Sequence, residues 1–541
     1  MNDEEGKHVT NPKLIKQIIT EHFQSKFRDE DYEDIEPFKG EPRPLSKIII
    51  SNEVRECINK LNNGRAPGKD NICNEYLKHA PPVIDEQIAN IFNKTLESHE
   101  HLGINEGLLI TIPKPGKPKG PPSNLRPITL LNSVRKVLST IVLNRIRPRV
   151  EKYISNSQSG FRPNRSTSDV VWAHRWITAK VLNATEVKVN ITGIDISAAF
   201  DTINRTKLLE ILRDIIDEDE LRIIRFLLSE TIDVKINGAH DLMPFTTNIG
   251  TPQGDSLSPV LFIVYLEHAL RNIKPVQNDK QEPVPAEIIY ADDIDFIGKK
   301  DADVNSIEKT LKTHCLKVNV DKTELTSVRK DSEDWKTTKK VGSLLGSKED
   351  IEHRKNLSKI AFNKLTNIWK SGNKTKQKTK IKLYNSLVKS VLLYNCGTWA
   401  LTKTDEDRLD SFHRKQLRNT LGIRYPTIIS NASLYKKCRE APLSMQVLEA
   451  RWRLFGHVLR RDRNIPANKA MPFYFSDNKR ARGKPQTTLP ITLNNDLKKL
   501  VATKLELTTQ TDLDTPHSRR STKMECPGRR DKENSRSCKI R

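Results

Sequence analysis

The chain has 541 residues, a length that predicts several domains rather than one core. Its net charge of +24 favours a polyanionic partner, either nucleic acid or an anionic membrane. No apolar run reaches the ~18 residues that a membrane span needs, and the charged start MNDEEGKHVT lacks the hydrophobic stretch of a secretory signal, so we expect nucleic acid as the partner, no membrane, and an intracellular protein of the nucleus and/or cytoplasm.

The cysteines are scattered along the chain, with no C-x-x-C pair and no nearby Cys/His quartet. That spacing is typical of reduced thiols in an intracellular protein, and it argues against both a zinc site and a disulfide framework. We therefore expect seven free thiols, at Cys57, Cys73, Cys315, Cys396, Cys438, Cys526 and Cys538.

The N-terminal part of the chain is weakly patterned at first and then helical. Residues 1–50 have mixed charges and little periodicity, so we expect them to be partly disordered. Ser51 is placed to cap a helix whose apolar face carries Val54 and Ile58. A second helix is predicted over 84–98, so that residues 51–104 form a helical extension.

Strands and helices alternate from residue 105 to about 350. Segment 108–132 predicts a strand followed by a Pro- and Lys-rich loop. Segment 133–154 predicts a helix, with apolar residues recurring at Val137, Ile141, Ile146 and Val150. This alternation indicates an α+β or α/β core.

Residues 351–500 are predicted to be all-helical, and residues 351–400 carry 11 Lys and Arg against one acid. The basic run 370–382 is either a solvated loop or a contact with a nucleic-acid duplex. The tail 501–541 is basic and polar, so we expect it to be disordered. Three tryptophans on apolar helical faces are predicted to pack in the core rather than stack on bases: Trp369, Trp399 and Trp452.

The segment EIIYADDIDFIG at 287–298 predicts a strand, a tight turn and a second strand, with Asp292 and Asp293 at the turn. An isolated Asp-Asp is most often an ordinary turn dipeptide. Here both flanking strands are strongly apolar, which favours a turn directed inward. Two adjacent carboxylates in such a place need a counter-charge, and a divalent metal ion supplies it.

A third acid fits the same site. Asp195 lies on the same strand parity as Val187, Val189 and Ile191, just before a run of small residues. Aspartates on two strands, together with substrate phosphates, suffice to hold two Mg²⁺ ions about 3.5–4 Å apart. One ion would activate an attacking 3′-hydroxyl and the other would neutralise a leaving pyrophosphate. Hard oxygen ligands suit Mg²⁺, with Mn²⁺ as a substitute.

Seven motifs in order, over roughly residues 50–350, resemble those of reverse transcriptases. YADD at 290–293 resembles their Y/F-x-D-D hairpin, and DISAAFD at 195–201 resembles their first palm motif. The others are TPQGDSLSPVLF (251–262), QSGFRPNRSTSD (158–169), LRPITLLN (125–132), CLKVNVDKTE (315–324) and GSLLGS (342–347). Ordered motifs are far more specific than one Asp-Asp pair.

The subgroup that the chain most resembles is the polymerases of non-long-terminal-repeat (non-LTR, LINE-type) retrotransposons. NNGRAPGKDNICNEYLK at 62–78 resembles their N-G-K-A-P-G-x-D segment. KLYNSLVKSVLLYNCGTWAL and RWRLFGHVLRRD resemble the helical region that follows their palm. The resemblance implies an α+β right-hand polymerase with fingers, an antiparallel-sheet palm, a helical thumb and a helical C-terminal extension.

The resemblance also implies roles for individual residues. Asp195 and Asp292 would be metal ligands with Asp293 as the adjacent catalytic acid, and Ile196 would belong to the metal site. The implied nucleotide-binding residues are Arg126, Arg162, Phe200, Gln253, Gly254 and Lys322, with help from Lys114. Arginine suits this role because its planar guanidinium group can form two hydrogen bonds with phosphate oxygens at once. GSLLGS would form the primer grip, although it lacks the aromatic residue usual before Leu-Gly.

Phe200 bears on whether the nucleotide substrate carries a ribose or a deoxyribose. It lies five residues after Asp195, where the family places a ring that leaves no room for a 2′-hydroxyl. RNA polymerases with a similar palm usually have an acid at that spacing, whereas here the acid, Asp201, is one residue later. The resemblance thus favours DNA synthesis from an RNA template, a DNA primer and dNTPs.

Other interpretations stay open at this point. Arg162 and Lys322 fit ordinary surface charges, and Gln253 fits a turn cap. The chain as a whole fits a noncatalytic nucleic-acid-binding remnant of such an element, or an RNA-dependent RNA polymerase. About fifty residues precede the polymerase-like region, and neither an N-terminal endonuclease nor a C-terminal zinc knuckle is expected. The sequence sets no oligomeric state.

Overall fold

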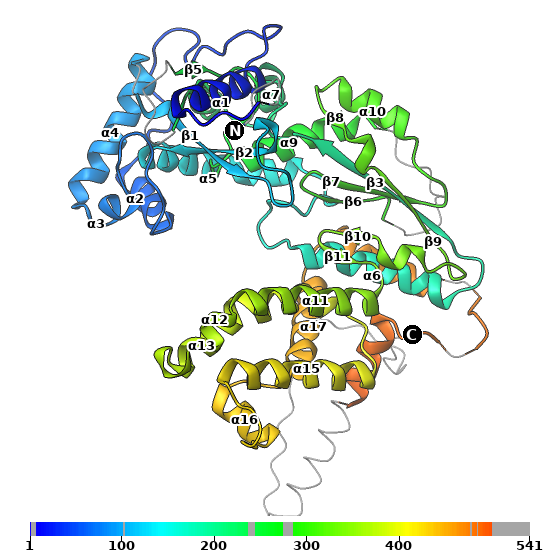
Figure 1. Cartoon of the computed structure of the whole chain (residues 1–541). Coiled ribbons are helices and arrows are strands. Elements are labelled where there is room, and N and C mark those ends of the chain that lie inside the picture. The colour runs from blue at the N-terminus through cyan, green and yellow to red at the C-terminus, as the bar shows by residue number, and fades with distance from the viewer. Residues whose placement is uncertain are drawn as a thin grey trace, which may run out of the picture.

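The computed structural model describes residues 1, 7–100, 103–235, 244–273, 285–476, 479–483 and 485–499. Mixed helix and sheet occupy the N-terminal two thirds, and helices alone follow (Figure 1). The predicted tail 501–541 lies outside the described residues, as do Cys526 and Cys538. The five described cysteines are free thiols. No helix in the described part of the chain combines the length and apolar character of a membrane span.

The N-terminal residues contain an ordered helix that the sequence analysis did not predict. Helix α1 (Pro12–Phe27) is capped by Asn11, whose side chain accepts from the Lys13 amide. Its buried residues Ile19, Phe23 and Phe27 pack on the small sheet described below. A helix that lacks strong amphipathic patterning is stabilised here by tertiary burial rather than by propensity.

Three helices follow α1: α2 (Ser51–Lys60), α3 (Asn74–His79) and α4 (Pro82–Ser98). Ser51 is the first helical residue of α2 and not its cap. The Glu53 carboxylate accepts from the backbone amide of Ile50, which is the capping position. The predicted helix over 84–98 is confirmed by α4.

A four-stranded sheet with strand order β2-β1-β4-β5 lies beside α1 and α5 (Figure 1). Strands β1 and β2 are an antiparallel pair, and β4 runs parallel to β1. The predicted strand in 108–132 and the predicted helix 133–154 are confirmed by β1 and α5. Bounds are β1 (Glu106–Pro113), β2 (Leu125–Leu131), β4 (Thr231–Val234), β5 (Phe245–Thr246) and α5 (Ser133–Tyr153).

The second sheet has five strands, and every pairing in it is antiparallel. Strand β3 is central: β7 pairs with one edge, while β9 and β8 share the other edge end to end. Its bounds are β3 (Val189–Ser197), β6 (Glu287–Tyr290), β7 (Asp293–Gly298), β8 (Lys317–Val318) and β9 (Glu324–Val328).

Helices on either side of this sheet form two hydrophobic cores. The larger core holds Ile194, Ile196 and Phe262 together with residues of α5, α7, α8 and α9. The other core holds Ile191 and Trp172, and α18 returns from the C-terminal region to pack along α6. Bounds are α6 (Thr167–Asn183), α7 (Arg205–Arg213), α8 (Glu218–Leu228), α9 (Ser258–Arg271), α10 (Val304–Lys312) and α18 (Pro466–Phe475).

The helical region begins after a short hairpin of β10 (Lys339–Lys340) and β11 (Ser343–Leu344), which contains the GSLLGS segment. Trp399 is fully buried and Trp369 nearly so, as predicted, while Trp452 lies at the margin of the α6–α18 core. Bounds are α11 (Ser347–Lys364), α12 (Thr366–Trp369), α13 (Gln377–Tyr384), α14 (Ser390–Leu392), α15 (Lys403–Leu421), α16 (Asn431–Cys438) and α17 (Leu443–Leu459).

Candidate active site

The YADD segment forms the tight hairpin between β6 and β7. Tyr290 pairs with Asp293 across the hairpin, so the turn consists of Ala291 and Asp292 alone. Ala291 has a φ of 57°, a left-handed value that two-residue hairpin turns need at their first position. The predicted hairpin is confirmed, with one difference in register: Asp292 lies in the turn, whereas Asp293 already opens β7.

Strand register brings the third acid to the same place. Asp195 on β3 stands directly opposite Asp293 on β7. Directly opposite side chains on antiparallel strands have Cβ atoms about 4.5–5.5 Å apart. The sheet thus gathers Asp195, Asp292 and Asp293 at one end of the β3–β7 pair, as the parity of the strand predicted.

These carboxylates interact unfavourably with one another. Burial, and then the charge of Asp195, raises the pKa of Asp292. Desolvation, and then repulsion from Asp292, Asp295 and Asp195, raises the pKa of Asp293 to about 6. The Asp293 side chain is exposed, so solvent screening weakens this shift. Burial is the first cause of both shifts and mutual repulsion adds to it, so a divalent cation bound here would favour the ionised carboxylates.

The donor set of the cluster fits Mg²⁺, because it consists of hard carboxylate oxygens. In the described part of the chain, no three His, Cys, Asp or Glu side chains converge so as to hold a metal ion by themselves. The Ile196 side chain is buried in the larger core, so only its backbone carbonyl is available to an ion.

Lys322 lies at the same cluster. Its Nζ stands 3.1 Å from Oδ2 of Asp195, and the rest of the lysine side chain is exposed. A pocket of about 340 Å³ opens beside the pair and is also lined by Asp293, Asp295 and Lys340. Sequence reasoning placed Lys322 here and missed Lys340, whose Nζ donates to Oδ1 of the buried Asp295 at 2.7 Å. Asp295 shares the strand parity of Asp293, a signal that could have found this pair.

The segment that precedes α6 supports the YADD turn from outside the sheet. The Gln158 side chain accepts from the Ala291 amide at 2.9 Å and donates to the Ala291 carbonyl at 3.2 Å. The Ser159 amide donates to the Ile289 carbonyl at 2.8 Å. Gly160 lies so close that a Cβ on it would stand 2.2 Å from the Ala291 nitrogen. Residues 158–160 therefore fix the position of Ala291, and with it Asp292.

Replacing Gly160 with alanine is expected to push this segment away from the turn. Overpacking of this kind costs ~1–3 kcal/mol in a well-packed interior, and here the backbone that must yield is that of Ala291. We expect a lower free energy of unfolding and a disturbed YADD turn. Urea denaturation measures the free energy of unfolding. Single-turnover primer extension measures the effect of the disturbed YADD turn. Gly103→Ala is the matched control, because its φ is not in the left-handed region and a Cβ there would meet only the Glu106 carboxylate, at 3.9 Å; an equal effect in both variants would contradict the interpretation.

Arg162 is not directed at the carboxylates. Its guanidinium is almost fully buried and forms a two-pronged ion pair with Glu151, with donor distances of 3.0 and 2.9 Å. It also donates to the Ser155 and Gln158 carbonyls. In this arrangement Arg162 braces the segment that supports the turn, and its predicted contact with a triphosphate stays a prediction. The resemblance gave its place in the motif but not this partner.

Phe200, Gln253 and Gly254, three further predicted nucleotide-binding residues, lie around Asp201 and the loop that follows Pro252. The Phe200 ring packs on Phe262 with a centroid separation of 4.7 Å. The Gln253 side chain donates to Oδ1 of Asp201 at 2.9 Å. Gly254 has a φ of 127°, and a Cβ on it would stand 2.6 Å from the Thr129 carbonyl oxygen, so this position requires glycine.

Two basic residues on the four-stranded sheet face this group. Arg126 lies on β2 with an exposed side chain, and Lys114 follows β1. The pKa of Lys114 is lowered by its partial burial and then by the charges of Lys26 and Arg126, while Asp201 opposes the shift. Lys114, Arg126 and Asp201 are therefore electrostatic neighbours, and Lys26 of α1 joins them.

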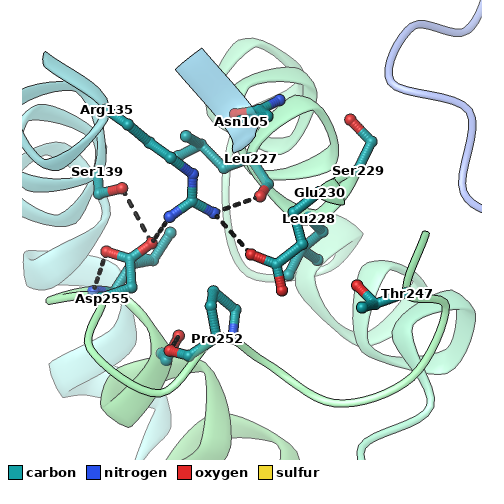
Figure 2. A network of polar contacts seen from close by, with 12 residues as sticks. Asn105, Arg135, Ser139, Leu227, Leu228, Ser229, Glu230, Thr247, Pro252 and Asp255 are labelled. Atoms are coloured by element: carbon teal, nitrogen blue, oxygen red, sulfur yellow. Dashed lines mark hydrogen bonds and ion pairs between the residues drawn. The ribbon is translucent and has the colours of Figure 1, made fainter. Parts of the chain in front are cut away.

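A buried ionic network fixes the loop that carries Gln253 and Gly254 (Figure 2). Arg135 on α5 places Nη1 3.0 Å from Oδ2 of Asp255, and the Ser139 hydroxyl donates to the same oxygen. Nη2 of Arg135 donates to the Leu227 carbonyl at 2.6 Å and lies 3.7 Å from Glu230. These side chains are almost fully buried. Through them the loop that carries Gln253 and Gly254 is anchored to α5 and to the end of α8.

Comparison with known proteins agrees with the geometry. Residues 112–380 match the family model described as reverse transcriptase (RNA-dependent DNA polymerase). A probable RNA-directed DNA polymerase from transposon BS of Drosophila melanogaster is 28% identical over 253 residues, 45% of this chain and 27% of that protein. The RNA-directed DNA polymerase from mobile element jockey of the same species is 29% identical over 263 residues, 47% of this chain and 28% of that protein.

This chain spans just over a quarter of the length of those curated relatives. Among solved structures, telomerase from Candida albicans overlaps 70% of this chain and 65% of its own chain. That overlap has 12% identity and a TM-score of 0.34, a weak similarity.

Proposed function

We propose that this chain is an RNA-directed DNA polymerase of a non-LTR retrotransposon, because residues 112–380 match the reverse transcriptase family model. The observation that carries the proposal is the strand register that sets Asp195 opposite Asp293, beside Asp292 in the turn. In this proposal the partners are an RNA template, a DNA primer and dNTPs.

The architecture suits this assignment. The five-stranded antiparallel sheet would be the palm, and the four-stranded sheet with α5 would belong to the fingers (Figure 1). The helices from α11 to α15 would form the thumb, followed by a helical C-terminal extension. In domain terms, residues 105–350 would hold fingers and palm, and residues 351–500 the thumb and C-terminal region.

In the proposed reaction the 3′ oxygen of the primer bonds to the α-phosphorus of the incoming nucleotide, its proton is lost, and the bond to pyrophosphate breaks. Asp195 and Asp292 would hold Mg²⁺, or Mn²⁺ as a substitute, with Asp293 beside them. The bound ions would favour the ionised 3′ oxygen and neutralise the leaving pyrophosphate. Lys322, already paired with Asp195, adds a positive charge on the same side of the sheet.

The remaining side chains would orient the nucleotide. Arg126 and Lys114 carry the positive charge that a triphosphate needs, and Gly254 allows the backbone to approach the ligand closely. The Gln253 side chain donates to Oδ1 of Asp201, so this oxygen is already engaged and is not free to accept from a ribose 2′-hydroxyl. This arrangement supports deoxynucleotides over ribonucleotides as substrates.

Primer extension by the purified chain tests the proposal. The substrate is an RNA template annealed to a DNA primer, with Mg²⁺ and either dNTPs or NTPs. We expect incorporation of dNTPs. Duplex binding without any incorporation would overturn the catalytic assignment and leave a nucleic-acid-binding remnant, whereas preferred incorporation of NTPs would identify an RNA polymerase.

Replacing Phe200 with alanine is expected to relax the choice of sugar. The ring is held in place by Phe262 and by Phe161, whose centroid lies 5.9 Å away. Removing it opens space for a 2′-hydroxyl, so the ratio of kcat/KM for dNTP to that for NTP should fall roughly tenfold or more. Single-nucleotide incorporation assays give this ratio. Phe161→Ala is the comparison variant, since it loosens the ring without removing it; an unchanged ratio in Phe200→Ala would show that the ring does not select the sugar.

A further inference from the structure

Helix α1 lies outside the residues that match the reverse transcriptase family, yet its C-terminal end is fixed to the candidate nucleotide site. The Asn248 and Ile249 amides both donate to the Phe27 carbonyl, at 3.1 and 3.3 Å. Two residues further on, the Thr251 amide donates to the Phe200 carbonyl at 2.9 Å. The end of α1, the Phe200 segment and the loop that carries Gln253 are thus held together by backbone hydrogen bonds.

Lys26, in the last turn of α1, extends into this site. Its Nζ stands 2.7 Å from Oδ2 of Asp201, and the lysine side chain is 30% exposed against 6% for the aspartate. The ammonium also lies 5.7 Å from the centroid of the buried Phe27 ring. Its position is therefore restricted by α1 itself, and a part of the side chain still faces solvent.

Positive charge exceeds negative charge around this point. The charged neighbours that shift the pKa of Lys114 are the cations Lys26, Arg126 and Lys117 and the single acid Asp201. The pKa of His22 is lowered as well, by partial burial and then by Lys26 and Lys114. One carboxylate does not balance these cations, so the group is suited to a polyanion of small size.

We propose that Lys26 is a binding residue for the triphosphate of the incoming nucleotide, contributed by the N-terminal helix in addition to Lys114 and Arg126. This assignment rests on the proposed function. Without nucleotide, Lys26 pairs with Asp201. A triphosphate offers several anionic oxygens and competes for the ammonium, while Gln253 continues to donate to Asp201. Helix α1 is then a part of the nucleotide site and not only a cover on the small sheet.

The test uses the full chain and two readouts, one of which does not require catalysis. Calorimetry measures binding of inorganic tripolyphosphate, and primer extension on the RNA–DNA substrate measures KM and kcat for dNTPs. Lys26→Met should weaken tripolyphosphate binding and raise KM, each about tenfold, since charge-assisted contacts are worth ~1.5–3 kcal/mol. The kcat should change little, Lys26→Arg should retain most of the affinity, and the exposed Lys13→Met on the same helix should match the wild type.

Asp201→Asn gives a result of opposite sign, which a loss of folding cannot imitate. It frees Lys26 from its ion pair and should strengthen tripolyphosphate binding several-fold, and this gain should shrink in the Lys26→Met background. Unchanged affinity and KM in Lys26→Met would overturn the proposal and leave the ion pair as an anchor for α1. If the wild type incorporates no nucleotide but Lys26→Met still loses tripolyphosphate binding, the catalytic assignment fails while the anion site stands.

Discussion

Replacing Asp292 with alanine is expected to abolish nucleotide incorporation while the chain still folds and binds an RNA–DNA duplex. Asp292 lies in the two-residue turn of the β6–β7 hairpin, next to Asp293 and close enough to Asp195 for that charge to raise its pKa. In the proposed reaction it holds Mg²⁺. A metal ion contributes several kcal/mol of transition-state stabilisation, so its loss should lower the rate of incorporation by about 10³-fold or more.

The fold itself should tolerate this change. Asp292 is half-buried, and the neighbouring charge of Asp195 raises its pKa. Removing the Asp292 carboxylate therefore relieves repulsion. The free energy of unfolding should stay equal or rise slightly. Single-turnover primer extension measures the rate, and fluorescence anisotropy measures duplex binding.

Asp301→Ala is the matched control for Asp292→Ala, because Asp301 is an exposed aspartate that follows the same hairpin. The catalytic role of the turn would be refuted if Asp292→Ala retained more than a tenth of the wild-type rate. It would also be refuted if both variants lost incorporation equally.

The part of the site that could be predicted from the sequence depends on local patterns. Alternation of apolar residues defined the β6–β7 hairpin, and strand parity alone put Asp195 on the same side of the sheet as the acid pair. These features follow from a period of two residues and from a turn only two residues long. Which strand pairs with β3, and the register that sets Asp195 against Asp293, come from the assembled sheet and not from the pattern of either strand.

The sequence could not predict contacts between distant segments. Arg162 lies in a motif that resembles a phosphate-binding one, but its guanidinium is taken by Glu151 on α5. Lys26 stands 175 positions before Asp201, in a helix of low amphipathicity whose order depends on burial of Phe23 and Phe27. No periodicity or spacing reports such pairs, because they form only when the sheets and helices are assembled.

The network of Arg135 also joins segments far apart in the sequence and could not be predicted from it. Breaking this network is the second change for which we expect a large effect. Replacing Asp255 with alanine is expected to lower the free energy of unfolding by ~3–5 kcal/mol. Breaking one side of a buried ion pair leaves the other charge without compensation. The Arg135 and Asp255 side chains are almost fully buried at a separation of 3.0 Å, so neither charge can turn to water (Figure 2).

Comparison with neighbouring variants separates the charge from the hydrogen bonds. Ser139 donates to the same oxygen of Asp255, so Ser139→Ala removes a hydrogen bond without removing a charge and should cost only ~1 kcal/mol. Urea denaturation gives these free energies. The double variant Arg135→Met with Asp255→Ala should lose less free energy of unfolding than the sum of the losses of the two single variants. In the double variant both charges of this pair are absent, so neither is left buried without its partner.

The pH dependence of Arg135→Met gives the network a signature that a simple packing defect would not show. Burial already raises the pKa of Glu230, while Arg135 and Arg205 oppose the rise. Without Arg135 the folded state holds the Glu230 carboxylate with less compensation, so the pKa of Glu230 lies further above its unfolded value. The folded state then binds more protons than the unfolded state, so stability falls as pH rises. The loss caused by Arg135→Met should therefore be smaller at pH 5 than at pH 8. If the loss of free energy of unfolding did not depend on pH, packing rather than charge would hold the loop 252–255 in place.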